Sequence, residues 1–101
     1  MFARNVTFHV KPNQGKEVAA KFQKEILPLL RKANGFQDQI TMFRDNETSA
    51  ISLWNNKEQL DAYTKDTDPQ VAKLLEPLIS GAPEVRTYEV STSTSHKYIA
   101  A

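Results

Sequence analysis

The sequence predicts an α+β domain with the element order βαββαβ, a ferredoxin-like arrangement in which a four-stranded antiparallel sheet carries its helices on one face. Three observations carry this prediction. Residues 48–64, TSAISLWNNKEQLDAYT, alternate as a strand up to Trp54 and then change to helical spacing. A second alternating stretch precedes them across the turn at 45–47, which indicates a hairpin. The chain of 101 residues is long enough for one small domain.

The first strand and the first helix are separated by Pro12. Residues 3–11 alternate apolar and polar side chains, and Pro12 ends the strand because it has no amide hydrogen to donate. Asn13 is the expected N-cap of a helix that runs to Lys32. Pro28 lies within this helix, so we expect a kink or a loosened last turn. The apolar face of the strand holds Val6, Phe8 and Val10, and the apolar stripe of the helix holds Val18, Phe22, Ile26, Leu29 and Leu30.

The hairpin and the helix after it follow next. Two strands, at 36–44 and 48–54, are joined by a tight turn. Asn55 is the expected cap of the second helix, because its side-chain oxygen can accept from the first free amides. Glu58, three residues on, is expected to return a hydrogen bond to the Asn55 amide, as in a capping box.

The chain is expected to end with a short helix, a last strand and a tail. Asp68-Pro69 marks the start of the short helix, with Asp as the cap and Pro at the first helical position. Ser80-Gly81 is expected to close it, and the last strand is expected from residue 84 to about residue 92. We therefore assign 1–92 to the domain and 93–101 to a C-terminal tail or dimer arm.

Strand alternation assigns each side chain to one of two faces of the sheet. The expected helix-covered face holds Val6, Phe8, Val10, Phe36, Ile40, Met42, Ile51, Leu53, Tyr88 and Val90. The expected open face holds Asn5, Thr7, His9, Gln37, Gln39, Thr41, Phe43, Ala50, Ser52, Trp54 and Val85. A solvated face would not need Trp54 and Phe43, and a core would not accept so many amides and hydroxyls. We therefore expect a partly polar interface, in a homodimer whose sheets face each other.

The composition excludes several classes of site and partner. The formal net charge is +1, which indicates neither a nucleic acid nor a membrane partner. The absence of cysteine excludes disulfides and thiolate sites. No signal peptide and no transmembrane run is recognisable, so a cytoplasmic location is expected. Asp61, Asp66 and Asp68 do not predict a metal site, because no second cluster complements them and Asp68 is expected to serve as a cap.

These features resemble the antibiotic biosynthesis monooxygenase (ABM) family, whose members are dimeric α+β barrels. The resemblance covers nearly the whole chain and depends on the element order and on Gly35-Phe36 at the start of the second strand. It also depends on residues 52–63, SLWNNKEQLDAY, in which a strand-end tryptophan precedes polar residues and an amphipathic helix bearing an aromatic residue. The family includes cofactor-free oxygenases that act on polycyclic aromatic or quinol substrates, haem-degrading enzymes, and proteins with no assigned activity.

The cofactor-free branch makes few demands on the sequence. Its substrates are phenols or hydroquinones, which pass an electron to dioxygen themselves once they are deprotonated. The protein then supplies an apolar cavity, a few hydrogen-bonding groups and exclusion of water. Such a site leaves no strict spacing motif, so no catalytic residue is assigned.

The haem-degrading branch uses an Asn on the first strand and a Trp and a His in the second helical region. The positions of the Trp and the His fall here on Tyr63 and Lys73. By parity Arg4, and not Asn5, shares the face of Val6. An ammonium group is a poor iron ligand, because it must first lose its proton. We therefore expect neither haem nor any other cofactor.

Each candidate pocket residue has a functional and a structural interpretation. Trp54 is a wall of an aromatic-binding cavity or, as we favour, packs in a dimer interface or at an edge of the sheet. Tyr63 donates to a substrate oxygen or is half-buried with its hydroxyl in water. Lys73 steadies a phenolate at the pocket mouth or is a solvated helix charge. Arg4 and Arg86 bind an anionic group or lie at strand ends in solvent. The aromatic residues that belong to the core first and to a cavity second are Phe8, Phe22, Phe36 and Tyr88.

Three functions stay open at this point, in descending order. The first is a cofactor-independent monooxygenase-like enzyme acting on a small aromatic or quinol substrate, in a pocket between sheet and helices. The second is a non-catalytic dimeric binding or stress-related protein of the same fold. The third is haem binding or degradation.

Overall fold

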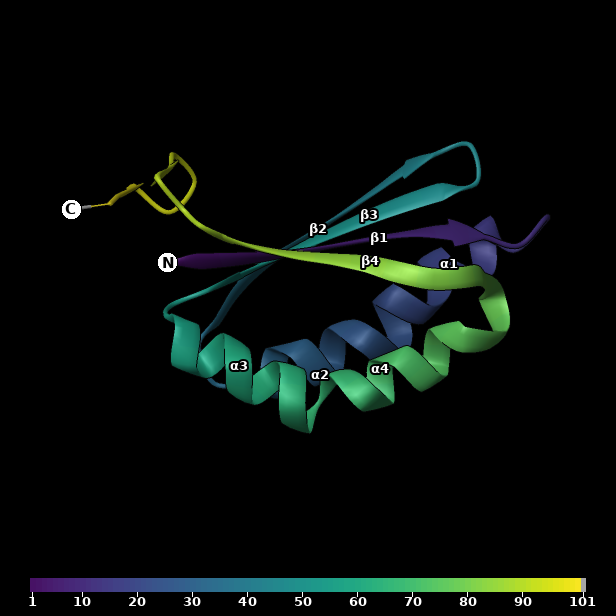
Figure 1. Cartoon of the computed structure of the whole chain (residues 1–101), viewed down its shortest axis with the longest axis horizontal. Coiled ribbons are helices and arrows are strands. Elements are labelled where there is room, and N and C mark those ends of the chain that lie inside the picture. The colour runs from purple at the N-terminus through teal and green to yellow at the C-terminus, as the bar shows by residue number, and fades with distance from the viewer. Residues whose placement is uncertain (101) are drawn as a thin grey trace.

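The computed structural model describes residues 1–100 and confirms the expected βαββαβ order. Strands β1 (Phe2–Val10), β2 (Phe36–Arg44), β3 (Glu47–Trp54) and β4 (Ile79–Glu89) form one antiparallel sheet in the order β2-β3-β1-β4. All the helices lie on one side of this sheet, and the other side is open (Figure 1). None of the helices within residues 1–100 is long and apolar enough to span a membrane.

The N-terminal helical region contains a π-helical insert. It consists of α1 (Gly15–Lys21), the π-helical turn η1 (Phe22–Ile26) and α2 (Leu27–Lys32). Within η1 the bonding shifts by one residue, and the Leu27 amide donates to the carbonyl of Phe22. Pro28 follows in α2 and cannot donate to the ladder. The disturbance expected at the proline therefore takes the form of a π turn just before it.

The predicted helix caps at Asn13 and Asn55 are wrong. Asn13 has a φ of 65° and forms a left-handed turn, a conformation that Asn tolerates, and the first helix begins after Gln14 without a side-chain cap. Asn55 does not cap α3 (Lys57–Asp66), because its amide donates to the carbonyl of residue 35 at 2.9 Å and holds it in line with the hairpin. The cap is Asn56, whose Oδ1 accepts from the backbone amide three residues on at 2.9 Å. The expected capping box with Glu58 is therefore absent from α3.

The last strand begins earlier than expected. Helix α4 (Asp68–Leu75) begins one residue before the expected start, with Thr67 at the cap position, and it ends in the 3-10 turn η2 (Glu76–Leu78), which contains Pro77. Ser80-Gly81 lies inside β4 and does not close a helix. Gly81 has a φ of 72°, and the pairing of β4 with β1 shifts here, so residues 81–83 bulge.

The assignment of side chains to faces is correct for β1 and wrong for much of β2, β3 and β4. Pairing places Ser52 beside Arg4 and Ala50 beside Val6, so the even positions of β3 face the helices. A second bulge, between Phe36 and residue 38, reverses the alternation in β2. The side chains now on the open face are Ile40, Met42, Ile51, Leu53 and Tyr88, and those now on the helix side are Gln39, Thr41, Phe43, Ala50, Ser52, Trp54 and Val85. Val90 lies just beyond β4.

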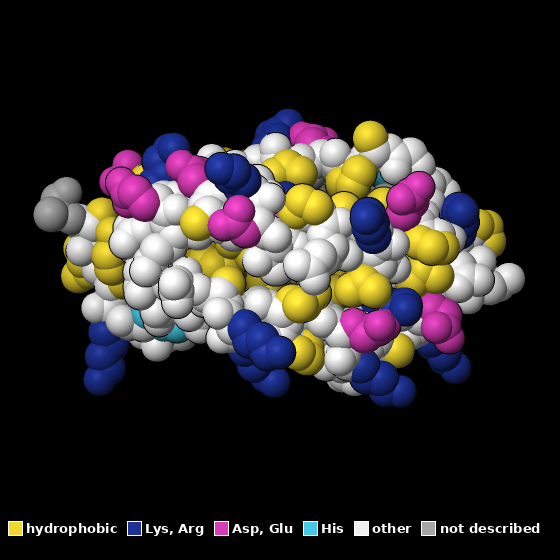
Figure 2. All heavy atoms as spheres, turned by 90° about the horizontal axis from the view of Figure 1, so that it is seen from below, with side chains coloured by type: hydrophobic (Ala, Val, Ile, Leu, Met, Phe, Trp, Pro, Cys, Tyr) yellow, Lys and Arg dark blue, Asp and Glu magenta, His cyan; other side chains and the backbone are white. Residues whose placement is uncertain are grey.

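The core lies between the sheet and the helices, with Trp54 at one end of it. The Trp54 side chain is fully buried, so the predicted role of Trp54 in a dimer interface is wrong. The core residues are Phe8, Val10, Val18, Phe22, Ile26, Leu30, Ala50, Trp54, Leu60, Tyr63, Val71 and Leu75. On the outer surface of the helices, Lys and Arg are interspersed with Asp and Glu over the upper part of the view, and Lys and Arg side chains follow one another along its lower edge (Figure 2).

The C-terminal segment forms a small hairpin beside the N-terminus. Strands β5 (Thr92–Ser93) and β6 (Tyr98–Ile99) pair with each other, apart from the main sheet. The N-terminal ammonium of Met1 donates to the Tyr98 hydroxyl at 3.0 Å. The predicted division at residues 92 and 93 stays a prediction, and Ala101 lies outside the described residues.

Candidate functional site

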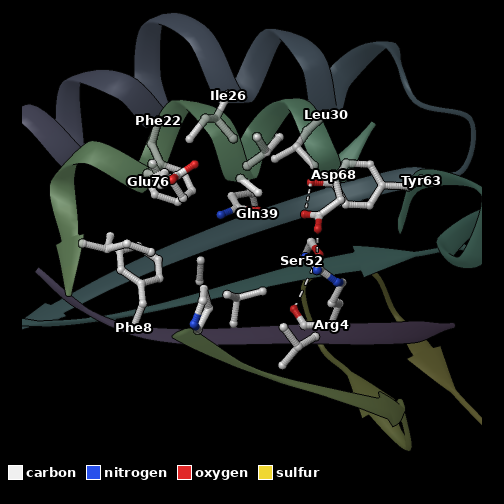
Figure 3. A pocket seen from close by; sticks show the side chains of 18 of the residues that line it. Arg4, Phe8, Phe22, Ile26, Leu30, Gln39, Ser52, Tyr63, Asp68 and Glu76 are labelled. Carbon is white, nitrogen blue, oxygen red and sulfur yellow. Dashed lines mark hydrogen bonds and ion pairs between the residues drawn. The ribbon is translucent and has the colours of Figure 1, made fainter. Parts of the chain in front are cut away.

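A largely apolar cavity of about 440 Å³ lies between the sheet and the helices. Its volume is within the range of small-molecule sites, roughly 300–1,000 Å³. The sheet supplies its floor and the helices its roof (Figure 3). The apolar side chains that line it are Val6, Phe8, Phe22, Ile26, Leu30, Ala50, Val71, Ala72, Leu75, Ile79, Pro83 and Val85.

One end of the cavity holds an ion pair and a phenol. Arg4 Nη2 lies 3.1 Å from Asp68 Oδ2, and the Arg4 side chain is almost completely buried. The Tyr63 hydroxyl donates to Asp68 Oδ1 over 3.4 Å. The guanidinium carbon of Arg4 lies 5.8 Å from the centre of the Tyr63 ring, which adds a cation–π contact. Figure 3 shows the three side chains gathered on one side of the cavity.

Three local features bring this polar end together. Arg4 shares the face of Val6 and Phe8 on β1, as its parity predicts. Tyr63 lies in the last turns of α3, and Asp68 is the first residue of α4. Because the two helices are separated only by Thr67, residues five apart in the sequence can meet at the junction.

Trp54 and Ser52 support the polar end from behind. The Trp54 indole Nε1 donates to Ser52 Oγ at 2.9 Å, and Ser52 Oγ donates to the Arg4 carbonyl at 3.5 Å. The Trp54 ring packs on Tyr63 with centroids 4.7 Å apart and meets the edge of Phe36 at 5.6 Å. The side-chain N–H of Trp54 and O–H of Ser52 are thus both donated within the protein. We therefore assign these two residues the role of supporting Tyr63 and Arg4.

Tyr63 is a hydrogen-bond donor at this site. Burial raises the pKa of its hydroxyl well above the ordinary value of 10.0, and the negative charge of Asp68 raises the pKa further. Arg4 opposes this rise but does not cancel it. Tyr63 therefore stays protonated near neutral pH and cannot act as a general base there.

Two further polar side chains face the cavity. Gln39 reaches in from β2, with its amide nitrogen donating to Thr41 Oγ1 at 3.1 Å. Glu76, in η2, lies toward the end away from Tyr63 (Figure 3).

The structure brings together half of the residues proposed from the sequence. Arg4, Phe8, Phe22 and Tyr63 line the cavity, and Phe36 and Trp54 lie behind Tyr63. Lys73 is exposed on α4 and does not line the cavity. Tyr88 lies on the open face of the sheet, and so does Arg86, which pairs with Glu84.

The main residue that sequence reasoning missed is Asp68. It was expected to cap α4, but its side chain makes no cap bond, and the residue at the cap position is Thr67. The carboxylate is directed at Arg4 and Tyr63 instead. A signal was present: Arg4 shares the apolar parity of β1 and therefore needs a buried anionic partner. Ser52 and Gln39 were missed because their strands were assigned to the wrong face.

The described residues do not form a metal site. No group of three or more His, Asp or Glu side chains within residues 1–100 is arranged to hold a metal ion. The two histidines are remote from the cavity, with His9 exposed near Glu47 and His96 in the C-terminal hairpin near Asp38.

Comparison with known proteins identifies the fold. No protein-family model matches the sequence, and no curated protein matches it. Solved structures do match over most of the chain. The NE2512 protein of Nitrosomonas europaea, of unknown function, superposes with a TM-score of 0.77 at 17% identity, covering 92% of this chain and 91% of that one.

Two matching structures have informative names. SnoaB, a cofactor-independent oxygenase from Streptomyces nogalater, matches with a TM-score of 0.74 at 15% identity, covering 92% of this chain and 95% of that one. MhuD, with two manganese protoporphyrin IX molecules bound per active site, matches with a TM-score of 0.75 at 13% identity, covering 93% and 98%. Other matches carry the name antibiotic biosynthesis monooxygenase. This chain therefore shares the ferredoxin-like α+β fold of ABM-type proteins.

Proposed function

We propose that this protein is a member of the ABM family and a cofactor-independent monooxygenase acting on a small aromatic or quinol substrate. The observation that carries the proposal is the cavity between sheet and helices, which is largely apolar and holds the cluster of Arg4, Asp68 and Tyr63 at one end. An apolar enclosure with a few convergent polar groups is what such a substrate requires.

In the proposed reaction a phenolic substrate is activated at the polar end. Asp68 accepts the proton of the substrate hydroxyl, Arg4 stabilises the phenolate that forms, and Tyr63 orients Asp68 by its hydrogen bond. The phenolate gives an electron to dioxygen, and the two radicals combine at a ring carbon. Loss of water from the resulting peroxide leaves a quinone. One oxygen atom of dioxygen enters the product, and the other leaves in water.

Oxygen consumption with a panel of phenols and hydroquinones tests this proposal. We expect uptake above that of buffer with at least one substrate, and a fall of about 100-fold or more in the rate for Asp68→Asn, because general bases typically contribute 10²–10⁴-fold. Lys73→Ala is the control, since Lys73 is exposed outside the cavity. No uptake above buffer across the panel would overturn the proposal.

A second candidate is a non-catalytic binding protein of the same fold. The observation that favours it is that the charges at the polar end are already neutralised within the protein, as Arg4 and Asp68 pair with each other. Saturable binding of aromatic compounds without any oxygen uptake would select this function over the first.

The cavity does not fit a haem-ligating role. Among the described residues that line it there is no histidine, methionine or lysine to bind iron, and the phenol of Tyr63 is bonded to Asp68. The resemblance also assigns the Trp and His positions of the haem-degrading branch to Tyr63 and Lys73, neither of which supplies an imidazole. We predict no Soret shift when haemin is mixed with the protein.

We also propose that the protein is a homodimer whose open sheet faces pack together. The residues that support this differ from those expected, since Trp54 lies in the core. Ile40, Met42 and Tyr88 are 45–49% exposed on the open face, and Ile51 and Leu53 lie among them. Such a group of apolar side chains on one face is typical of an interface. The cytoplasmic location stays a prediction.

A further inference from the structure

We infer that the Arg4–Asp68 pair makes the cavity selective for uncharged aromatic ligands that carry a hydroxyl group, and that it excludes aromatic carboxylates. The inference rests on the proposed function in one respect, since it assumes that the cavity takes an aromatic ligand. It concerns recognition and not oxidation, so it can be tested separately.

The charges of the described residues in the cavity wall leave no cation free to pair with an anionic ligand. Within the described chain, Arg4 is the one cationic side chain that lines the cavity, while Asp68 and Glu76 are anionic. Arg4 and Asp68 neutralise each other at 3.1 Å, with the Arg4 side chain almost completely buried and that of Asp68 mostly so. A carboxylate that enters therefore finds no unpaired cation, and it must approach the carboxylate of Asp68.

Arg4 and Asp68 keep hydrogen-bonding capacity that a ligand hydroxyl can use. Tyr63 donates its hydroxyl hydrogen to Asp68, and the Ser52 hydroxyl both accepts from Trp54 and donates to a backbone carbonyl. Arg4 has five N–H donors, of which the pair with Asp68 uses only part, and a carboxylate has about four acceptor positions. A ligand hydroxyl satisfies both residues, because it donates to Asp68 and accepts from Arg4.

Three probes with one ring system test this on the unmodified protein. We expect calorimetric titration to show 1-naphthol binding at least about tenfold more tightly than 1-methoxynaphthalene, which cannot donate a hydrogen bond, since about 1.4 kcal/mol corresponds to tenfold in affinity. We expect 1-naphthoate to bind more weakly than either. Naphthoate binding as tightly as naphthol, or methoxynaphthalene binding as tightly as naphthol, would overturn the inference.

Substitutions at the pair reverse the selectivity. In Asp68→Asn the cation of Arg4 is no longer neutralised, so we expect naphthoate to gain at least about tenfold in affinity and naphthol to lose affinity. In the double variant Arg4→Met/Asp68→Asn the gain for naphthoate should disappear, which separates a charge effect from a loosened cavity. Asp66→Asn is the matched control, because it removes an exposed carboxylate two residues away and should leave the order of the probes unchanged.

The results also separate this inference from the proposed function. Oxygen uptake with hydroquinones but no preference among the probes would overturn the inference alone. The expected order of the probes without oxygen uptake would uphold the inference and overturn the oxygenase. If Asp68→Asn does not fold, the three probes on the unmodified protein still decide.

Discussion

At the scale of single residues, Tyr63 shows how burial changes what a side chain can do. Its ring packs between Trp54 and Arg4, and its hydroxyl faces the carboxylate of Asp68. Both the loss of water and the nearby negative charge disfavour the phenolate. These surroundings keep the Tyr63 hydroxyl protonated. They also make the free energy of unfolding depend on pH through this residue.

The stability of the protein should fall as the pH rises above 10. Tyr63 loses its proton near pH 10.0 in the unfolded chain but keeps it in the folded one, so the folded state binds more protons in this range. The free energy of unfolding then falls by about 1.4 kcal/mol per pH unit from this one residue. Urea unfolding of the unmodified protein and of Tyr63→Phe, compared at pH about 9 and about 11, measures the effect.

The comparison between the two proteins isolates Tyr63. Exposed groups whose pKa values are also raised, such as Lys57 and Arg86, are common to both and cancel in the difference. Equal pH dependence of the two proteins would show that Tyr63 is not buried as described.

At the scale of elements, the order of strands and helices could be predicted and their faces could not. Periodicity and the signals Pro12 and Asp68-Pro69 are local and strong, so the elements of the βαββαβ order were found, whereas the short hairpin of β5 and β6 was not. The face of a strand depends on register, and two bulges, at 36–38 and 81–83, change the register without a mark in the alternation. In β3 both sets of positions carry apolar side chains, so the pattern alone could not place Trp54.

The site shows the same division. The face of β1 on which Arg4 lies was predicted correctly, because β1 pairs with β3 without a bulge and its alternation is therefore regular. Asp68 was missed because an aspartate before a proline is typical of a helix cap, and the long-range partner that claims it is 64 positions away, from 4 to 68. The sequence around Asp68 does not identify this partner, and the parity of Arg4 indicates only that some anionic partner is needed.

The corrected cap of α3 can be tested by a pair of alanine substitutions. Asn56→Ala should lower the free energy of unfolding by about 1 kcal/mol, because it removes the acceptor for the Gln59 amide. Asn55→Ala should have a much smaller effect, since Asn55 contributes a backbone amide that alanine retains. Denaturant unfolding measures both, and a larger loss for Asn55→Ala would restore the cap that the sequence suggested.

At the scale of the whole molecule, one face of the sheet builds the cavity, and the other is the face that we propose binds a second copy. The helices cover only one side, and the open side presents Ile40, Met42 and Tyr88. A small domain gains much of its stability from burying apolar surface, and a second copy supplies a matching face.

A charge in the open face should therefore dissociate the proposed dimer. Met42→Lys should shift the sedimentation profile toward the monomer at micromolar concentration, because the ammonium group would be desolvated in the interface. Lys16→Met, in the exposed first turn of α1, is the control and should leave the profile unchanged. An unmodified protein that sediments as a monomer would contradict the proposed assembly.

The claim on which the account depends is that the cavity beside Tyr63 is where a ligand binds, and one NMR signal reports on it directly. Trp54 is the one tryptophan in the sequence, so the protein has a single indole N–H resonance, from a group bonded to Ser52 and packed on Tyr63. Titration with a hydroquinone should move this resonance in a saturable way and leave the backbone amide of Tyr88 unmoved. A fixed indole resonance, with shifts confined to the open face around Tyr88, would contradict the account.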